Sequence, residues 1–150
     1  MLIRAATNDD CQTLADFNGA LASETEDHAL DAGVVLSGVR RGLELAPDVQ
    51  YYVAEVDREV IGQLMVTREW SDWRDGWIWW IQSVYVQADH RGSGVFRNLL
   101  QHVTDFAVAE SDVVGIRLYV ENANERAQEV YARSGFVDPN YRVLERIFDA

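Results

Sequence analysis

The feature of this sequence that most constrains its fold is an abrupt change of hydrophobic period close to Gly92. Before the change, Trp77–Gln87 is rich in aromatic and β-branched residues, which is typical of a strand. After it, apolar residues recur at helical spacing over Gly94–Glu110, and Gly115–Val120 again resembles a strand. A strand, a helix and a strand in this order predict two parallel strands joined by a right-handed crossover.

The rest of the chain supplies further strands and helices around this central unit. Before it we expect a strand at Leu2–Ala6, a helix that starts near Thr7, a helix at Asp31–Leu45, and strands at Gln50–Val56 and Val60–Arg68. After it we expect a helix at Asn124–Ser134 and a last strand at Tyr141–Phe148. The order β-α-α-β-β-β-α-β-α-β predicts an α/β (α+β) fold, with a mixed central sheet of about six or seven strands flanked by four helices. With 150 residues, the chain is expected to form a single domain over residues 1–150.

Composition narrows the classes of partner. The formal net charge of −12 disfavours nucleic acid and favours a cationic partner. No apolar run approaches the ~20 residues of a membrane helix, and the polar start argues against a secretory signal, so we expect no membrane association. Cys11 is the only cysteine, so we expect a reducing cytoplasm and treat Cys11 as buried filler. The three histidines show no ligand spacing with Cys11 or paired carboxylates, and we predict no metal.

Five tryptophans lie close together, at Trp70, Trp73, Trp77, Trp79 and Trp80. Such rings can line a pocket for a cationic amine, or they can serve core packing and a contact between two copies of the chain. We expect Trp70 and Trp73 to be the exposed pair, because they share a loop with charged residues. The chain is compatible with a homodimer.

The loop between the central strand and helix has the composition of an anion site. Gly92 and Gly94 let the backbone approach a ligand, and Arg91 adds a forked donor suited to phosphate. The following helix contributes backbone N–H groups and the positive end of its dipole. A P-loop is excluded because the loop has no lysine. A dinucleotide-binding fingerprint would need a glycine where Arg97 stands, although Glu121 could imitate the ribose-binding acid of that fingerprint. Coenzyme A is the third phosphate-containing ligand that such a loop could bind.

Two motifs resemble the GCN5-related N-acetyltransferase (GNAT) superfamily. The run Arg91–Phe96 is similar to the family's Arg/Gln-x-x-Gly-x-Gly/Ala cofactor motif, with Phe96 in place of the last small residue. The run Asn124–Phe136 matches Asn-x-x-Ala-x-x-x-Tyr-x-x-x-Gly-Phe without a gap. The resemblance covers the half of the chain from about Trp77 to Phe136, and it implies binding of acetyl-CoA as co-substrate.

The resemblance also implies roles for individual residues. The pantetheine arm would pair with the strand at Val84, Tyr85 and Val86. The pyrophosphate would lie on the six loop residues Arg91, Gly92, Ser93, Gly94, Val95 and Phe96. Asn124 would reach the pantetheine, and Tyr131 would lie near the thioester sulfur.

The implied reaction is direct attack of a primary amine on the thioester of acetyl-CoA. The backbone N–H of Val84 would stabilise the oxyanion, and Tyr131 would protonate the leaving thiolate as general acid. Glu24 and Glu26 are candidates for the base or for a substrate contact, and Glu55 is a weaker one. The acceptor would be a small-molecule or peptide amine, favoured as a cation by the acidic chain.

Four alternatives remain open at this point. Tyr131 could be an ordinary buried tyrosine on an amphipathic helix, and the glutamates could be a solvated acidic loop. The chain could be a sensor module that holds acyl-CoA without turnover. It could also be a nicotinamide-dependent oxidoreductase.

Overall fold

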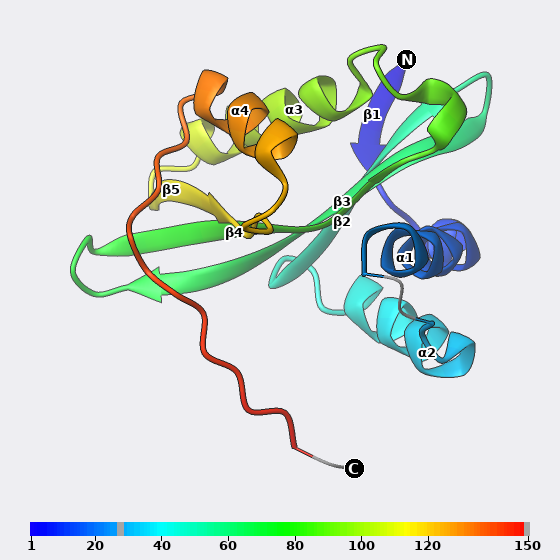
Figure 1. The fold of residues 1–150 in the computed structure, drawn as a ribbon, viewed down its shortest axis with the longest axis horizontal. Coiled ribbons are helices and arrows are strands. Elements are labelled where there is room, and N and C mark those ends of the chain that lie inside the picture. Colours follow the sequence, from blue (N-terminus) through cyan, green and yellow to red (C-terminus); the bar gives the residue numbers. More distant parts are fainter. Residues whose placement is uncertain (27–28, 149–150) are drawn as a thin grey trace. The chain divides into compact units, whose positions relative to one another are not determined.

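The computed structural model describes residues 1–26 and 29–148 (Figure 1). It divides into two compact units, Met1–Leu118 and Tyr119–Ala150, and each is described by itself. The first unit contains the whole sheet and the first three helices.

The first unit is built on a five-stranded sheet in the order β1-β2-β3-β4-β5. The strands are β1 (Leu2–Ala5), β2 (Val49–Val56), β3 (Glu59–Ser71), β4 (Gly76–Val86) and β5 (Val113–Leu118). Neighbours from β1 to β4 run antiparallel, whereas β4 and β5 run parallel. The parallel pair confirms the arrangement predicted from the change of period.

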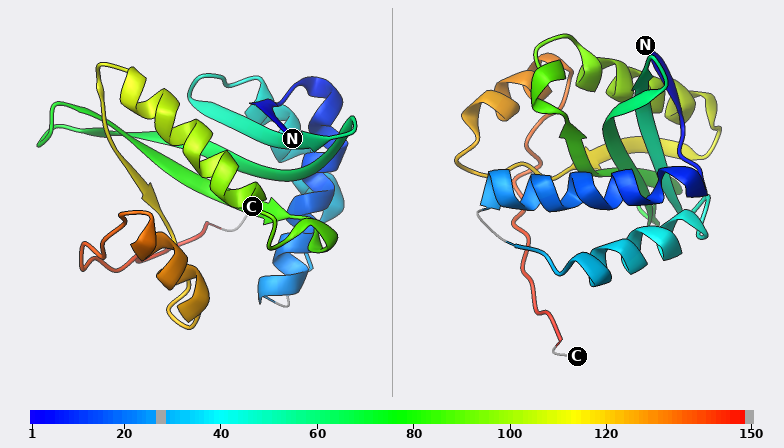
Figure 2. Two further views of the ribbon diagram at one scale, coloured as in Figure 1. Left: turned by 90° about the horizontal axis from the view of Figure 1, so that it is seen from above. Right: turned by 90° about the vertical axis from the view of Figure 1, so that its right-hand side faces the viewer.

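Three helices cover the two faces of this sheet. The helices α1 (Cys11–Glu26) and α2 (Ala32–Leu43) lie on one face, and α3 (Val95–Ala109) lies on the other (Figures 1 and 2). Two short 3-10 turns, η1 (Asn8–Asp10) and η2 (Ala88–His90), precede α1 and α3. Among the described residues, no helix is long and apolar enough to cross a membrane.

Two adjacent tyrosines show why the middle of β2 is apolar on both faces. Successive side chains on a strand point to opposite faces of the sheet. Tyr51 packs with Leu14 and Val39 in the core between the sheet and α1 and α2. The ring of Tyr52 contacts His102 of α3, with 5.3 Å between the ring centroids. Both faces of the middle of β2 are therefore buried, and residues 51–54 form a continuous apolar run instead of an alternating one.

The β2–β3 connection is a tight turn of two residues. Asp57 and Arg58 have φ values of 50° and 68°, which is the left-handed conformation that a type I′ turn requires at both central positions. This geometry matches the twist of the two strands, which pair antiparallel as a hairpin, and both strands were predicted from the sequence.

The second unit contains α4 (Glu125–Arg133). The Asn124 side chain caps it by accepting a hydrogen bond from the Ala127 N–H at 3.1 Å, and Gly135 with a φ of +92° follows its end. Both ends agree with the helix predicted at Asn124–Ser134.

The predicted strand at Tyr141–Phe148 is wrong, and the sheet has five strands instead of six or seven. The described part of this segment forms neither helix nor strand. Its large apolar side chains are between 66% and 92% exposed, namely Tyr141, Val143, Leu144, Ile147 and Phe148. The apolar pattern favours a strand, but a strand forms only where another backbone pairs with it.

A charged network ties the start of the chain to the sheet. Arg4 on β1 donates to both carboxylate oxygens of Asp10 at 2.8 and 2.9 Å, and to Glu55 on β2 at 2.7 Å. Asp10 is buried and also accepts from the backbone N–H of Thr7. The hydrogen bond from Arg4 is the main cause that lowers the pKa of Asp10. Glu55, considered above as a weaker base, is thus occupied by Arg4.

We expect Asp10→Asn to lower the free energy of unfolding at pH 7 by about 1.5–3 kcal/mol, because it removes charge-assisted hydrogen bonds from a buried site. A carboxyl with a lowered folded-state pKa contributes stability above its unfolded-state pKa of ~3.9 and loses it as the pH falls through the folded-state value. The difference between wild type and variant should therefore shrink below about pH 4.

Urea unfolding at pH 7 and pH 3 measures this difference. Asp48→Asn is the matched control, because the Arg68–Asp48 pair is exposed and is worth at most ~1 kcal/mol. Equal losses in both variants would contradict the assignment.

Candidate functional site

The candidate site lies along the part of β4 that pairs with β3 but no longer pairs with β5. On one side, β3 pairs with β4 as far as Val86. On the other, the pairing with β5 ends at Ile81 and Leu118. Residues 82–86 of β4 therefore lie beyond the last β5 pair, and their backbone forms an edge that an extended ligand can follow.

Along this edge, β4 carries a β-bulge. Gln63 pairs with Tyr85 and Met65 pairs with Gln82, so Ser83 and Val84 together lie opposite one residue of β3. Ser83 has a φ of 53°, in the left-handed region that costs a non-glycine residue energy. A bulge leaves one residue outside the ladder and re-aims its neighbours. The structure thus interrupts β4 at Val84, the residue whose N–H was predicted to stabilise the oxyanion.

The loop after β4 has an open, anion-accepting surface. Gly92 and Gly94 have φ values of 80° and 85°, and a Cβ atom added to Gly92 would meet nothing within 4 Å. The Ser93 hydroxyl donates to the carbonyl of His90 at 2.6 Å and braces the turn. The first turn of α3 follows at once, and its N–H groups have no intrahelical carbonyl to bond. This arrangement suits a pyrophosphate.

The next two predicted loop residues divide between core and surface. Val95 is buried and takes the core position at the start of α3. Phe96, which stands where the motif has a small residue, is half-buried.

Arg91 joins the loop to α1 and β4. Its Nε donates to the Val86 carbonyl at 2.8 Å, and its Nη2 donates to the Glu24 carboxylate at 2.8 Å. The Tyr85 hydroxyl donates to the same carboxylate at 3.4 Å, and the guanidinium lies 5.3 Å from the Tyr85 ring centroid. Burial, followed by the charge of Glu24, raises the pKa of Tyr85. The structure therefore brings together Glu24, Tyr85, Val86 and Arg91.

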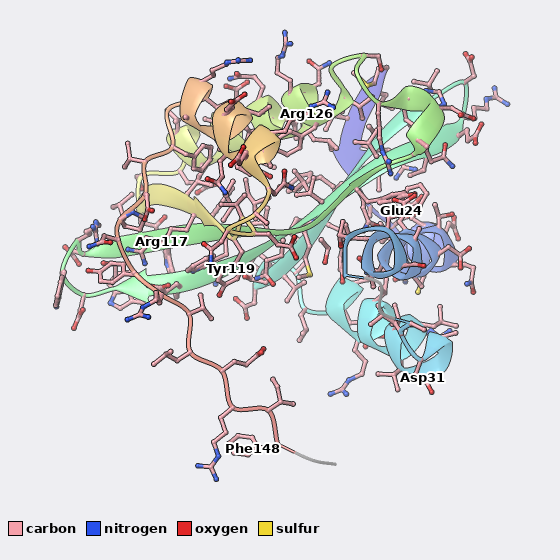
Figure 3. The ribbon with its side chains drawn as sticks, in the orientation of Figure 1. Glu24, Asp31, Arg117, Tyr119, Arg126 and Phe148 are labelled. Carbon is pink, nitrogen blue, oxygen red and sulfur yellow. The ribbon has the colours of Figure 1, made fainter. Side chains whose placement is uncertain are left out.

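The Glu24–Arg91 ion pair is accessible to solvent. Glu24 lies on the side of α1 that faces the sheet (Figure 3). The two side chains are 43% and 48% exposed, and a pair of this kind contributes at most ~1 kcal/mol. An incoming phosphate can therefore take the place of the Glu24 carboxylate on the guanidinium.

The remaining predicted residues lie elsewhere. Asn124 and Tyr131 belong to the second unit, where Asn124 caps α4 and the Tyr131 ring lies 5.9 Å from that of Phe136. Burial raises the pKa of Tyr131, so its hydroxyl is protonated at neutral pH, as a general acid requires. Their place beside the Arg91–Phe96 loop remains a prediction from the motif. Glu26 ends α1, and its side chain lies outside the described residues.

The tryptophan cluster separates into exposed and packed rings. Trp70 and Trp73 are exposed, as expected, but the expectation that both lie in a loop is wrong for Trp70, which lies on β3 opposite Trp77. Trp77 packs edge-on against Trp70 and carries the guanidinium of Arg68 at 4.4 Å from its ring centroid. Trp80 donates from its indole N–H to Glu69 at 2.8 Å.

Two site residues were missed by the sequence reasoning, namely Asn18 on α1 and Gln63 on β3. Gln63 is fully buried, and its side-chain nitrogen donates to the Asn18 side chain and to the Ser83 carbonyl, both at 3.0 Å. The signal for Gln63 was one amide side chain within the otherwise apolar run Val60–Val66. Nothing local in the sequence indicates Asn18.

Comparison with known proteins identifies a family and solved structures that this chain is similar to. Residues 14–136 match the family model described as Acetyltransferase (GNAT) family. A possible acetyltransferase from Clostridium difficile 630 is 38% identical, with a TM-score of 0.92 over 99% of this chain and 98% of that one. No curated protein matches the chain.

Two further solved structures share the fold. A probable acetyltransferase is 24% identical, with a TM-score of 0.86 and full coverage of both chains. A transcriptional regulator from Bacillus halodurans C-125 is 20% identical, with a TM-score of 0.81 over 98% of this chain and 99% of that one.

Replacing a loop glycine and a helix glycine by alanine should change the free energy of unfolding in opposite directions. Gly94→Ala should lower the free energy of unfolding by about 1–2 kcal/mol, because an L-residue is strained at a φ of 85°. Gly19→Ala, in the interior of α1 with no atom within 4 Å of the added Cβ, should raise it by about 0.5–1 kcal/mol. Urea unfolding of both variants measures the two changes, and a stabilised Gly94→Ala would show that the loop does not need its left-handed residue.

Proposed function

Because the chain belongs to the acetyltransferase (GNAT) family, we propose that it moves an acetyl group from acetyl-CoA to a primary amine. The amine attacks the thioester directly. The single observation that carries this proposal is the stretch of β4 beyond its last pair with β5, followed after η2 by the glycine loop that opens α3.

Three parts of acetyl-CoA have a proposed counterpart in this arrangement. The pantetheine arm carries amide groups in an extended chain, and residues 84–86 of β4 offer a backbone edge that can pair with them. The pyrophosphate then reaches Arg91–Phe96, where a cation, two glycines and a helix N-terminus favour negative charge. The thioester lies near the bulge at Ser83 and Val84 in this proposal.

The chemistry follows from this placement. The amine nitrogen forms a bond to the acetyl carbon, and the carbonyl oxygen becomes negative. The Val84 N–H donates a hydrogen bond to that oxygen. The carbon–sulfur bond then breaks, and the Tyr131 hydroxyl protonates the leaving thiolate. The amine loses its own proton to a water molecule or a carboxylate.

Glu24 is the proposed carboxylate at the acceptor side of the site, with Glu26, two residues later in the sequence, as a further candidate. Glu24 holds Arg91 in the free protein, and displacement by pyrophosphate would release its carboxylate toward the amine. With a net charge of −12, the chain favours a cationic acceptor. We propose the cytoplasm as its compartment, in keeping with its single cysteine.

Thermal unfolding with acetyl-CoA, with NADH as control, tests the cofactor. Acetyl-CoA at one hundred times its Kd should raise Tm by about 5–10 °C. A shift with NADH alone would overturn the proposal. Thiol release with a panel of amines then tests turnover.

We expect Arg91→Gln and Glu24→Gln to change acetyl-CoA affinity in opposite directions. Arg91→Gln removes the cation and should weaken binding, whereas Glu24→Gln removes a competing carboxylate and should strengthen binding by at most ~5-fold. Arg68→Gln, which breaks the remote Arg68–Asp48 pair, is the control and should leave the Kd unchanged. Isothermal titration measures the three values, and weaker binding by Glu24→Gln would contradict competition for Arg91.

We expect Tyr131→Phe to lower kcat by about 10²–10⁴-fold while the Kd for acetyl-CoA stays within threefold of wild type. Tyr141→Phe makes the same chemical change at an exposed tyrosine and should leave both values unchanged. Thiol release under saturating amine measures kcat. Full activity of Tyr131→Phe would exclude this hydroxyl as the acid.

A further inference from the structure

Gln63 is a polar side chain in an apolar place. It is 0% exposed, and the nearby β3 residues Ile61 and Leu64 belong to the core. Burying an amide is unfavourable unless hydrogen bonds replace those it made to water. Among the described residues, the Gln63 side-chain oxygen has no hydrogen-bond partner, so this amide is only half satisfied. An apolar side chain at this position would avoid that cost.

The other half of the amide holds the bulge. The side-chain nitrogen of Gln63 donates to the backbone carbonyl of Ser83, the residue in the left-handed conformation, at 3.0 Å. That bond crosses from β3 to the point where β4 leaves the ladder. It therefore supports a backbone conformation that a serine does not favour by itself.

The same nitrogen is anchored from outside the sheet. Its second hydrogen bond goes to the Asn18 side-chain oxygen on α1, also at 3.0 Å, and α1 lies against this face of the sheet (Figure 2). With both protons directed at oxygen atoms, the amide has one orientation. Asn18 thus fixes the orientation of the Gln63 amide, and Gln63 fixes the orientation of the Ser83 carbonyl.

We propose that Gln63 is a positioning residue for acetyl transfer, which fixes the bulge so that the Val84 N–H points at the thioester oxygen. This inference rests on the proposed function. Gln63 need not touch either substrate. It acts through the peptide between Ser83 and Val84, which contains both the carbonyl that Gln63 holds and the N–H that stabilises the oxyanion.

Gln63→Met tests the inference, because methionine has a similar shape but no amide proton. We expect Tm within about 4 °C of wild type and KM for acetyl-CoA within about threefold, with kcat lower by about 10- to 100-fold, as for a misplaced oxyanion donor. Gln50→Met makes the same change elsewhere in the sheet, where the amide donates to the adjacent Tyr51 carbonyl at 3.2 Å, and should keep wild-type kcat. Unchanged kcat in Gln63→Met would overturn the proposal, and so would equal loss in Gln50→Met.

Two further variants separate positioning from folding. Asn18→Ala removes the anchor alone and should lower kcat by a smaller factor, about 3- to 10-fold. Gln63→Glu can donate to the Ser83 carbonyl only when its carboxyl is protonated, so its kcat relative to wild type should rise as the pH falls. A ratio that does not change with pH would overturn the proposal. These variants also test it if Gln63→Met does not fold.

Backbone amide hydrogen exchange of the free protein tests the role of Gln63 without requiring acetyl transfer. Gln63→Met should speed exchange at residues 83–85 and leave the other β3–β4 amides unchanged. If wild type transfers no acetyl group, the proposed function fails, and the exchange still reports whether Gln63 holds the bulge. Unchanged exchange at these residues would overturn the inference whatever the activity.

Discussion

Strand β4 has two neighbours that accompany it for different lengths, and the rest of the site depends on this difference. The antiparallel ladder with β3 continues to Val86, whereas the parallel ladder with β5 ends at Ile81. Beyond Ile81, a bulge against β3 places Ser83 in the left-handed conformation. The result is an open backbone edge that leads directly to the start of α3.

The unpaired edge of β4 is held in place by contacts from other parts of the first unit. The core between the sheet and α1 and α2 fixes α1 through Leu14, and α1 in turn presents Asn18 to the bulge and Glu24 to the loop. One helix therefore braces the strand interruption and the anion loop. Packing on one face of the sheet is coupled to the backbone geometry of the edge.

Much of the fold follows from local pattern, and the exceptions are long-range. The change of period at Gly92 locates β4 and α3, and Asn124 marks the start of α4, because strand alternation and helix capping are properties of neighbouring residues. The strand expected at Tyr141–Phe148 fails because pairing depends on a distant backbone. The bonds from Gln63 to Asn18 and from Arg91 to Glu24 join residues 45 and 67 positions apart, and no local rule contains them. The loop glycines could be found from sequence, whereas their partners on α1 needed the fold.

The bond between Gln63 and Asn18 has a consequence for natural variation in this family. Loss of Gln63 leaves the Asn18 oxygen without this donor, and loss of Asn18 leaves Gln63 with its bond to the Ser83 carbonyl alone, so a substitution at either position weakens the reason to keep its partner. These two positions, far apart in the sequence and remote from the recognised motifs, are therefore expected to change together across related genes. Where both have become apolar, some other group must support the interrupted strand.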